Sequence, residues 1–441
     1  MQRFVVQPQG ALTGDCHIPG DKSISHRAIM LAAISDGRSR VTGFLSSEDC
    51  RATRTAFEAM GVSILEEGDA LLIDGVGLQG LQSPDAIIDL GNSGTGMRLL
   101  SGLLAGQRFD SAITGDASLR QRPMGRIIEP LHRMGAAIAG DNHDRAPLTI
   151  TGNQTLHGIN YESPVASAQI KSCLLLAGLY ADSATSVHEP GISRDHSERM
   201  LSAFGADIRQ SGRSVTLTPG ARLQARDVSV PADLSSAAFF LVGAAIAPGS
   251  DLHLPAVGIN PTRRGVLDIL AAMGADLTLA DERVVSGEPV ADINIRASDL
   301  HGVTIEGEQV ALAIDEFPAI FIAAACAEGT TILRNAEELR VKETDRIAAM
   351  AAGLTALGVD VEVFADGLAI TGNPRGPGFT GARIDSRGDH RIAMAFAIAA
   401  LRARAPITID DCANVATSFP NFVDLAVACG LDVSAVSEAD A

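Results

Sequence analysis

Apolar and polar residues follow a pattern that recurs six times along the chain. In each copy, a segment with apolar residues at helical spacing ends in glycine and runs into a strand-like segment. The copies read FEAMGVSI, LHRMGAAI, LSAFGADI, LAAMGADL, LTALGVDV and LAVACGLDV. Their glycines are Gly61, Gly135, Gly205, Gly274, Gly358 and Gly430, at intervals of 74, 70, 69, 84 and 72 residues. Glycine caps helices in the left-handed conformation because it has no Cβ, so this spacing predicts an internal repeat.

A second pattern recurs with the same period and predicts six buried helices. A polar cluster is followed each time by an almost wholly apolar, alanine-rich run. The six segments are DKSISHRAIMLAAI, GNSGTGMRLLSGLLAG, VASAQIKSCLLLAGL, ADLSSAAFFLVGAAI, DEFPAIFIAAACA and GDHRIAMAFAIAAL. A helix that is apolar on all sides is a buried helix, and the Ser, Asp or Asn residues of the cluster can cap its N-terminus.

Together the two patterns predict an α/β fold of two lobes, each built from three repeats. Strand-like pieces separate the helices, so each repeat reads helix, strand, helix, strand, with one further strand. At 441 residues the chain is also too long for one compact core. We expect an N-terminal lobe over residues 21–233 and a C-terminal lobe over 1–20 and 234–441, with hinges near Gly20–Lys22 and Pro231–Asp233. The first strand, Phe4–Gln7, is expected to pair with the C-terminal lobe.

Composition and charge narrow the class of protein. Hydrophobic residues make up 46% of the chain but aromatic residues only 4%, so the cores must be built from Ala, Val, Ile and Leu. A net charge of −18 argues against a nucleic-acid or anionic-membrane partner. No uncharged apolar run is long enough to span a membrane. The six cysteines form no CxxC pair and no secretory signal precedes Gly10, so we expect reduced thiols in a cytoplasmic protein.

The polar clusters at the helix starts are the candidate functional sites. A helix N-terminus carries unpaired N–H groups and a partial positive charge, so it can bind an anion. Six equivalent starts could all face one cleft between the lobes. Three of them also carry cations, which are Lys22 with Arg27, Arg98, and Arg391. The loops before the second helices add Arg122, Arg194, Lys342, Glu343 and Arg346. Any one of these arginines could simply form a surface salt bridge, but the matching repeat positions favour an anion site.

Lysines and carboxylates within these clusters suggest proton transfer. The chain has 35 Lys and Arg residues, of which only Lys22, Lys171 and Lys342 are Lys, and all three fall in or beside the clusters. A compact ammonium that can share a proton is a reason to keep Lys where Arg is otherwise used. Asp315 could act as a base or as a helix cap, and Glu343 could act as an acid or base or as an ion-pair partner.

Other sequence features do not predict a further binding site. Residues 75–80 fit GxGxxG, but no helix follows, so a dinucleotide site is not expected. The chain contains no P-loop motif and no spacing of His, Cys and carboxylates typical of a metal site. His390, beside Arg391, could be a ligand or base, or a cap.

Five segments resemble the sequence motifs of the 5-enolpyruvylshikimate-3-phosphate synthase family. They are GDKSISHRA, LGNSGTGMR, RQRPM, RVKETDR and GDHRIAMA, and they occur in this order along the whole chain. The family's fold is two lobes, each of three βαβαββ repeats around buried helices, an arrangement described as an inside-out α/β barrel. The resemblance therefore implies the architecture that the repeat already predicts, with an active site in the cleft between the lobes.

The resemblance also implies a transferase that needs no metal and no organic cofactor. The 5-hydroxyl of shikimate 3-phosphate would add to C2 of phosphoenolpyruvate while C3 is protonated, and the adduct would then lose phosphate. This reaction belongs to the shikimate pathway, which leads to chorismate and the aromatic amino acids. The herbicide glyphosate mimics phosphoenolpyruvate in the family, so glyphosate is a candidate inhibitor. We expect a monomer whose partners are small molecules.

Roles carry over to individual residues by position in these motifs. Asp315 matches the base for the 5-hydroxyl, Glu343 matches the residue that exchanges a proton with C3, and Lys22 matches a catalytic residue. The shikimate 3-phosphate site is matched by Lys22, Ser23, Arg27, Ser167, Ala168, Gln169, Arg194, Asp315 and Lys342. The phosphoenolpyruvate site is matched by Lys22, Asn92, Gly94, Arg122, Gln169, Arg346 and Arg391.

The chain departs from the family pattern at several positions. Many relatives have Ser in place of Ala168, so only a backbone contact is expected there. Many have Lys in place of Thr417, so the resemblance does not extend to the phosphoenolpyruvate contact of that Lys. Glu338, His188 and Leu99 also differ from residues in some relatives. Gly94 is the small residue usual in glyphosate-sensitive members, yet these differences leave sensitivity open.

Two alternatives use the same scaffold. A sister transferase acts on UDP-N-acetylglucosamine, but it carries a Cys before its RP dipeptide, where this chain reads GDASLRQRP. A non-catalytic anion-binding protein is the other alternative, and the presence of Lys22, Asp315 and Glu343 argues against it.

Overall fold

The chain folds into two compact units, each with its own hydrophobic core. The structure, a computed structural model, describes residues 2–376 and 378–437. Unit 1 comprises residues 1–19, 232–283 and 289–441, and unit 2 comprises residues 20–231 and 284–288. The short second piece of unit 2 is the turn of a hairpin whose strands otherwise belong to unit 1.

Unit 2 contains three repeats of the predicted kind. Its helices are α1 (Lys22–Ala33), α2 (Glu48–Ala59), α3 (Gly94–Ala105), α4 (Gly125–Arg133), α5 (Ala168–Gly178) and α6 (His196–Ala203), with a 3-10 turn η1 (Leu119–Gln121). Its strands are β3 (Asp36–Thr42), β4 (Ser63–Glu67), β5 (Ala70–Val76), β6 (Ile88–Asp89), β7 (Ser111–Thr114), β8 (Ala137–Asp141), β9 (Arg145–Thr151), β10 (Asn160–Glu162), β11 (Thr185–His188), β12 (Asp207–Ser211), β13 (Ser214–Thr218) and β14 (Val228–Ser229).

Unit 1 repeats the same order of elements. Its helices are α7 (Leu234–Ile246), α8 (Gly265–Ala272), α9 (Glu308–Leu312), α10 (Phe317–Ala325), α11 (Arg346–Ala356), α12 (His390–Ala399) and α13 (Phe422–Cys429), with 3-10 turns η2 (Glu337–Val341), η3 (Ala400–Arg402) and η4 (Ala413–Thr417). Its strands are β1 (Gln2–Val6), β2 (Thr13–Asp15), β15 (Asp251–Gly258), β16 (Asp276–Val285), β17 (Glu288–Arg296), β18 (Thr304–Ile305), β19 (Gly329–Leu333), β20 (Asp360–Phe364), β21 (Gly367–Gly372), β22 (Arg383–Asp385), β23 (Ile407–Asp410) and β24 (Val433–Ser437).

Each repeat contributes one small sheet, and the strands of the described residues form six separate four-stranded sheets. In the sheet ordered β6-β7-β9-β8, β6 runs parallel to β7, and the remaining neighbours are antiparallel. The α/β fold of two units with three βαβαββ repeats each is therefore confirmed. The sheets are not joined into one continuous barrel.

Strands from distant parts of the sequence complete three of the sheets. The predicted pairing of the first strand with the end of the chain is confirmed, because β1 lies between β23 and β24. In the same way β14 pairs with β3, and β2 pairs with β15. The first repeat of each unit thus receives its parallel edge strand from a segment outside the repeat.

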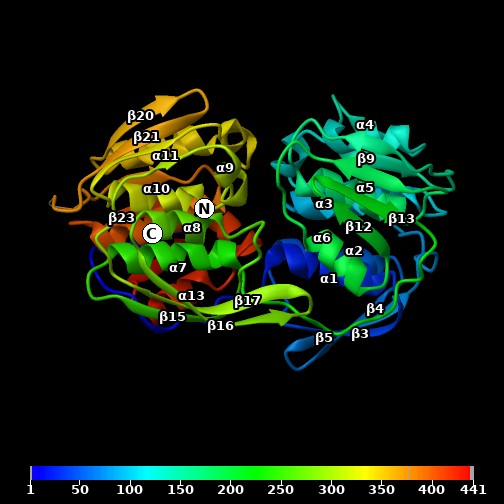
Figure 1. The fold of residues 1–441 in the computed structure, drawn as a ribbon, viewed down its shortest axis with the longest axis horizontal. Coiled ribbons are helices and arrows are strands. Elements are labelled where there is room, and N and C mark those ends of the chain that lie inside the picture. Colours follow the sequence, from blue (N-terminus) through cyan, green and yellow to red (C-terminus); the bar gives the residue numbers. More distant parts are fainter. Residues whose placement is uncertain (1, 377, 438–441) are drawn as a thin grey trace. The chain divides into compact units, whose positions relative to one another are not determined.

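The helices that were predicted to be buried lie inside each unit, and the sheets lie outside. Within unit 1, Figure 1 shows α7 and α10 between the hairpin of β20 and β21 on one side and β15 and β16 on the other. Every residue of α7 is buried, and so is every residue of α10. The six glycines of the repeat all have positive φ, between 85° and 110°, so their role after the second helices is confirmed.

Side chains at the starts of the buried helices cap them as predicted, with one exception. Asp21, Ser93, Ser167, Asp233 and Asp389 each accept a hydrogen bond from a backbone N–H in the first turn. The exception is α10, which begins at Phe317 after Glu316 and has no side-chain cap bond. Asp315 therefore does not occupy the N-cap position of α10, and its carboxylate contacts Lys342 and Arg346.

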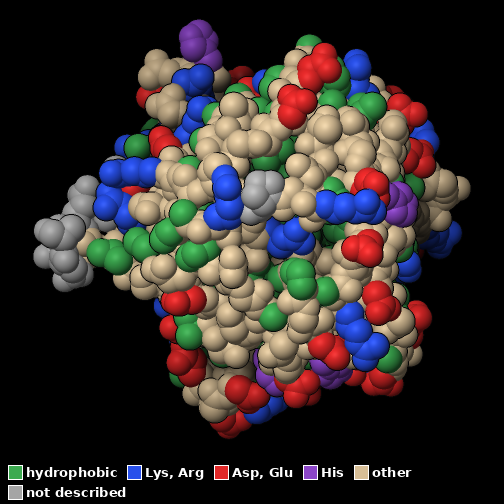
Figure 2. All heavy atoms as spheres, turned by 90° about the vertical axis from the view of Figure 1, so that its left-hand side faces the viewer, with side chains coloured by type: hydrophobic (Ala, Val, Ile, Leu, Met, Phe, Trp, Pro, Cys, Tyr) green, Lys and Arg blue, Asp and Glu red, His purple; other side chains and the backbone are tan. Residues whose placement is uncertain are grey.

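One face of the molecule carries a mixed surface rather than a uniformly acidic one (Figure 2). Figure 2 shows acidic, basic and hydrophobic side chains interspersed on one face of the molecule. None of the helices described here is long and apolar enough to cross a membrane. All six cysteines are free and buried.

Candidate active site

The start of α1 in unit 2 holds two of the predicted cations. Lys22 is the first residue of the helix, and its Nζ lies 2.5 Å from Oδ2 of Asp49, on α2. Arg27 lies one turn further on and is 5% exposed. Its Nε donates to Ser197 Oγ at 2.7 Å and its NH1 to the carbonyl of Ser23 at 2.9 Å. Both cations are thus held in fixed positions at one end of the helix.

The start of α3 forms a second basic group in unit 2. Arg122 donates to Asn92 Oδ1 at 2.7 Å, and Arg98 donates to Gln169 Oε1 at 2.9 Å. Gly94 lies between the two guanidinium groups. A Cβ at this position would come within 2.9 Å of Arg98 and 3.0 Å of Arg122, so the absence of a side chain lets both arginines reach the helix start.

The start of α5 completes the predicted sites of unit 2. Ser167 caps the helix through its hydroxyl, Ala168 is the first helical residue, and Gln169 follows. The methyl group of Ala168 offers no polar contact, so only the backbone there can bind an anion. Arg194, in the loop before α6, is half-buried. Burial lowers the pKa of Arg27 to about 10, and the positive charge of Arg194 acts in the same direction, so both cations belong to one electrostatic environment.

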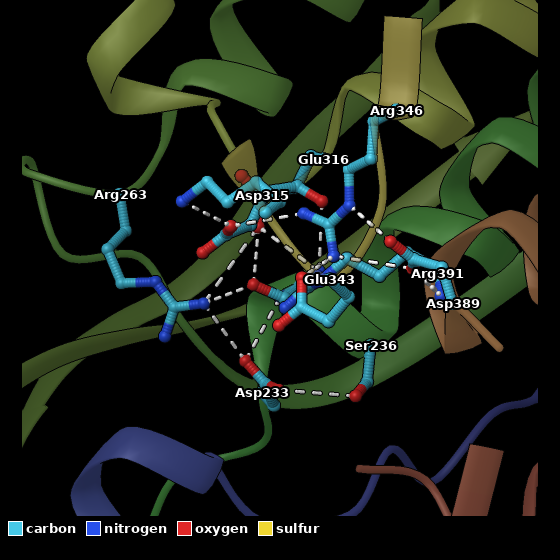
Figure 3. A network of polar contacts seen from close by, with 11 residues as sticks. Asp233, Ser236, Arg263, Asp315, Glu316, Glu343, Arg346, Asp389 and Arg391 are labelled. Carbon is cyan, nitrogen blue, oxygen red and sulfur yellow. Dashed lines mark hydrogen bonds and ion pairs between the residues drawn. The ribbon is translucent and has the colours of Figure 1, made fainter. Parts of the chain in front are cut away.

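In unit 1, the predicted base lies between two cations. Oδ1 of Asp315 is 3.3 Å from Lys342 Nζ and 3.4 Å from Arg346 NH1. Figure 3 shows the Asp315 carboxylate at the centre of a network of polar contacts that also includes Glu343 and Arg391. The structure therefore brings together five of the residues that the sequence singled out in this half of the chain.

Arg346 is the buried hub of this network. It is 1% exposed, and it contacts Glu343 at 2.6 Å and Asp389 at 2.8 Å. Burial acts to lower the pKa of this guanidinium, but the charges of Asp389, Glu343 and Asp315 outweigh that effect and raise the pKa above its ordinary value. The alternative interpretation of Glu343 as an ion-pair partner of Arg346 is thus observed, and it is compatible with a role in proton transfer.

Arg391 approaches Asp315 and Glu316 from α12. Its NH1 donates to the backbone carbonyl of Asp315 at 3.0 Å and lies 3.9 Å from Glu316 Oε1. Asp389, not His390, is the residue whose side chain caps α12. The interpretation of the His390 side chain as the N-cap of α12 is therefore wrong.

Arg263 is part of this network, and sequence reasoning missed it. It is 5% exposed, and its NH2 lies 3.1 Å from Asp233 Oδ1 and 4.0 Å from Glu316 Oε1. Figure 3 shows its guanidinium pointing toward Asp233 and the carboxylates around Asp315. The signal was present, because Arg263 stands in the loop before a second helix, the repeat position that supplied Arg122 and Arg194.

Two further expectations from the sequence concern Thr417 and a metal site. Thr417 is 5% exposed, and its hydroxyl donates to the carbonyl of Asn414 at 2.7 Å, so this side chain is used within η4. Among the residues that the structure describes, no three His, Cys, Asp or Glu side chains are grouped as a metal ion requires.

The fold and these sites together define a class of protein. Two units of three βαβαββ repeats present basic residues at the starts of buried helices, and one unit adds carboxylates held between cations. This arrangement is that of an enzyme that binds anionic substrates and moves protons between them.

Comparison with known proteins identifies the family. Residues 6–425 match the family model described as EPSP synthase (3-phosphoshikimate 1-carboxyvinyltransferase). The chain is 59% identical over 433 residues to a 3-phosphoshikimate 1-carboxyvinyltransferase of Methylococcus capsulatus, which covers 98% of both chains. It is 57% identical over 419 residues to the protein of that name from Geobacter sulfurreducens, covering 95% of this chain and 97% of the relative.

A solved structure agrees with these relatives. The EPSP synthase of Acinetobacter baumannii is 53% identical to this chain, with a TM-score of 0.90, and the match covers 99% of this chain and all of the other. The chain therefore belongs to the EPSP synthase family of enolpyruvyl transferases.

Proposed function

We propose that this enzyme transfers the enolpyruvyl group of phosphoenolpyruvate to the 5-hydroxyl of shikimate 3-phosphate and releases phosphate. The observation that carries the proposal is the position of Asp315, between Lys342 and Arg346, with Glu343 on the same guanidinium. Membership of the EPSP synthase family supports it. The reaction places the protein in the shikimate pathway, upstream of chorismate and the aromatic amino acids.

Shikimate 3-phosphate is assigned mainly to unit 2. A phosphate dianion needs several cations and N–H donors, and the starts of α1 and α5 supply both. The residues of this site are Lys22, Ser23, Arg27, Ser167, Ala168, Gln169 and Arg194, joined by Asp315 and Lys342 from unit 1. Contacts to Asp315 would bring the 5-hydroxyl to its base.

Phosphoenolpyruvate is assigned to arginines of both units. Its carboxylate and phosphate are planar or forked acceptors, and guanidinium groups bind such acceptors through paired hydrogen bonds. The residues of this site are Lys22, Asn92, Gly94, Arg122, Gln169, Arg346 and Arg391. Glyphosate, an anion of similar size, is proposed to compete for the same arginines.

The chemistry follows from the carboxylates. Asp315 takes the proton of the 5-hydroxyl while the hydroxyl oxygen bonds to C2 of phosphoenolpyruvate, and Glu343 delivers a proton to C3. In the second step Glu343 takes a proton back from C3, the double bond re-forms, and the C2–O bond to phosphate breaks. Arg346 now contacts Glu343 at 2.6 Å, so a substrate anion that takes over this guanidinium would release Glu343 for proton transfer.

We further propose that one active site draws on residues of both units, in a cytoplasmic monomer that needs no cofactor. Unit 1 would carry the acid and base, and unit 2 would carry most of the shikimate 3-phosphate contacts. Neither unit alone would then be active.

Phosphate release tests the proposed function directly. The full chain is mixed with phosphoenolpyruvate and either shikimate 3-phosphate or UDP-N-acetylglucosamine, and free phosphate is followed with time. We expect release with shikimate 3-phosphate only. No release with shikimate 3-phosphate would contradict the proposal, and release with the sugar nucleotide would favour the sister transferase.

The variant Asp315→Asn tests the role of the base. The amide keeps the shape of the side chain but cannot accept the hydroxyl proton, so kcat should fall by about 100- to 10,000-fold. Asp268→Asn, which removes a half-exposed carboxylate from the same unit, is the control and should keep normal activity. Turnover of Asp315→Asn near that of the parent would remove Asp315 from the mechanism.

A further inference from the structure

Lys171 is the one lysine of the chain that the proposed reaction does not use. It lies on α5, one turn after the cap residue Ser167, and its side chain is only 4% exposed. Its Nζ lies 2.7 Å from Glu189 Oε2 and 2.7 Å from Glu198 Oε1. A buried ammonium between two buried carboxylates is part of the protein interior and cannot itself reach a substrate.

Glu189 links this lysine to the predicted anion site. Its Oε1 accepts a hydrogen bond from the backbone N–H of Ser167 at 2.8 Å, and its Oε2 accepts one from Ser193 Oγ at 2.9 Å. Ser167 directly precedes Ala168 and Gln169, and Ser193 directly precedes Arg194. One carboxylate therefore holds both segments that are assigned to the phosphate of shikimate 3-phosphate.

Glu198 links the same lysine to Arg27. It lies on α6 next to Ser197, whose hydroxyl accepts a hydrogen bond from Arg27 Nε. Ser172, next to Lys171 on α5, accepts one from Arg27 NH2 at 2.9 Å, and the two serine hydroxyls are 2.6 Å apart. Two cations and two carboxylates are thus buried side by side and joined through α5 and α6.

Lys171 is paired with a carboxylate on each side, which lets the ammonium stay buried. A buried ion is stable only when it is paired and its hydrogen bonds are satisfied. Burial acts to lower the pKa of Lys171, but Glu198 and Glu189 together raise it above the ordinary value, so the lysine stays charged. The ammonium therefore holds the Glu189 carboxylate in place as an acceptor for Ser167 and Ser193.

We propose that Lys171 and Glu189 are positioning residues for the phosphate group of shikimate 3-phosphate. Glu189, held by Lys171, orients the backbone at Ser167 and the loop that carries Arg194, so that both can bind the same anion. This inference rests on the function proposed above. It adds two residues that act on one substrate through others and touch neither substrate themselves.

The two substrates should respond differently when this group is changed. The arginines assigned to phosphoenolpyruvate have other supports, since Arg122 is bonded to Asn92 and Arg346 to Asp389. Loss of Glu189 should therefore weaken binding of shikimate 3-phosphate and leave phosphoenolpyruvate binding nearly unchanged. A purely structural role would instead loosen both sites together.

The test compares Glu189→Gln with Glu288→Gln in the full chain. Both replace a buried glutamate by its isosteric amide, and Glu288 pairs with a different residue, His196 on α6, at 2.7 Å. For Glu189→Gln we expect the KM for shikimate 3-phosphate to rise by about 10- to 100-fold, the range for one lost hydrogen bond to a charged group. The KM for phosphoenolpyruvate and kcat at saturation should stay within about threefold, and Glu288→Gln should leave all three values nearly unchanged.

Two further variants keep the test decisive. Lys171→Arg retains the cation and should restore most of the affinity that Lys171→Met loses. Ser193→Ala removes one hydroxyl from a half-buried loop and is safe for folding, so it should raise the KM for shikimate 3-phosphate by about threefold even if Glu189→Gln does not fold.

An unchanged KM for shikimate 3-phosphate in Glu189→Gln and Ser193→Ala would overturn the proposal. So would a parallel rise for both substrates, or an equal effect of Glu288→Gln. Failure of the proposed function itself would look different, because the parent chain would then release no phosphate from either substrate pair.

Discussion

Each of the three lysines of this chain lies against a carboxylate, and its surroundings decide what it can do. Lys22 pairs with Asp49 and Lys342 with Asp315, and their side chains are 20% and 23% exposed. Lys171 pairs with two glutamates and is 4% exposed. The first two can exchange their partner for a substrate anion, whereas Lys171 can only support its neighbours. Residues of one type therefore have different roles, according to their burial and their partners.

At the same scale, His26 should make stability depend on pH. It lies on α1, with Nδ1 2.8 Å from Thr53 Oγ1, and burial, followed by the charges of Lys22 and Arg27, lowers its pKa to about 3. The unfolded chain binds a proton at this histidine below about pH 6.5, and the folded chain does not until about pH 3. The stability contributed by neutral His26 is therefore complete above pH 6.5 and is lost as the pH falls toward 3.

The variant His26→Asn measures this effect. Asn can replace the contact of Nδ1 but takes up no proton, so the free energy of unfolding should fall less between pH 7 and pH 5 than in the parent, by roughly 2 kcal/mol. Urea unfolding at the two pH values gives this difference. His143→Asn, at an exposed turn where the backbone has positive φ, is the control. Equal pH dependence in the parent and His26→Asn would contradict the assignment.

At the scale of elements, the buried helices pack closely enough for their backbones to touch. A Cβ at Gly102 on α3 would lie 2.1 Å from the carbonyl oxygen of Cys173 on α5. Both helices begin with predicted anion-site residues, so their close contact keeps Arg98 and Gln169 within hydrogen-bonding distance. The small and alanine-rich composition of these runs is therefore a requirement of the packing as well as of burial.

The variant Gly102→Ala should show this requirement. The added methyl group meets backbone, which cannot rotate away, so the free energy of unfolding should fall by about 1–3 kcal/mol or more. Gly178→Ala is the matched control, because its nearest atoms are the side chain of Thr185 at 3.1 Å and alanine favours the helix. Denaturant unfolding gives the free energy of unfolding of the two variants. We expect a clear loss in Gly102→Ala and little or no loss in Gly178→Ala, and equal changes in the two variants would disprove the contact argument.

At the scale of the whole molecule, the chain forms two cores and crosses between its units four times. The N-terminal segment belongs to unit 1, where β1 completes the sheet of the last repeat. The proposed substrates use residues of both units, with the base Asp315 in unit 1 and Arg27 in unit 2. Under the proposed function both units act on one pair of substrates, which predicts a more compact molecule when shikimate 3-phosphate is bound.

Small-angle X-ray scattering tests this coupling. Addition of shikimate 3-phosphate to the full chain should reduce its radius of gyration, because cations of both units would surround one anion. Inorganic phosphate at the same concentration is the control and should have a smaller effect. An unchanged radius of gyration at saturating shikimate 3-phosphate would argue against substrate-driven closure.

The sequence by itself determined the repeat, the buried helices and the residues at their starts. These features depend on local patterns: glycine is required where φ is positive, apolar runs form buried helices, and short polar side chains cap them. The motifs at these starts were enough to indicate the family, which the comparisons confirm. Local patterns determine whether each segment forms a helix, a strand or a turn, and the repeat determines how many times each element occurs.

Only the tertiary structure decided which charges meet. Arg346 contacts Asp389 and Asp315, 43 and 31 residues away, and Arg263 approaches Glu316 although α8 and α9 lie between them in the sequence. The same is true of Lys171, which the sequence marked as unusual but which packing places between two buried carboxylates. Pairings of this kind depend on how separate helices pack, because packing determines which buried charges lie close enough to neutralise one another. No pattern along the chain contains that information, because it arises when segments distant in sequence share one low-dielectric interior.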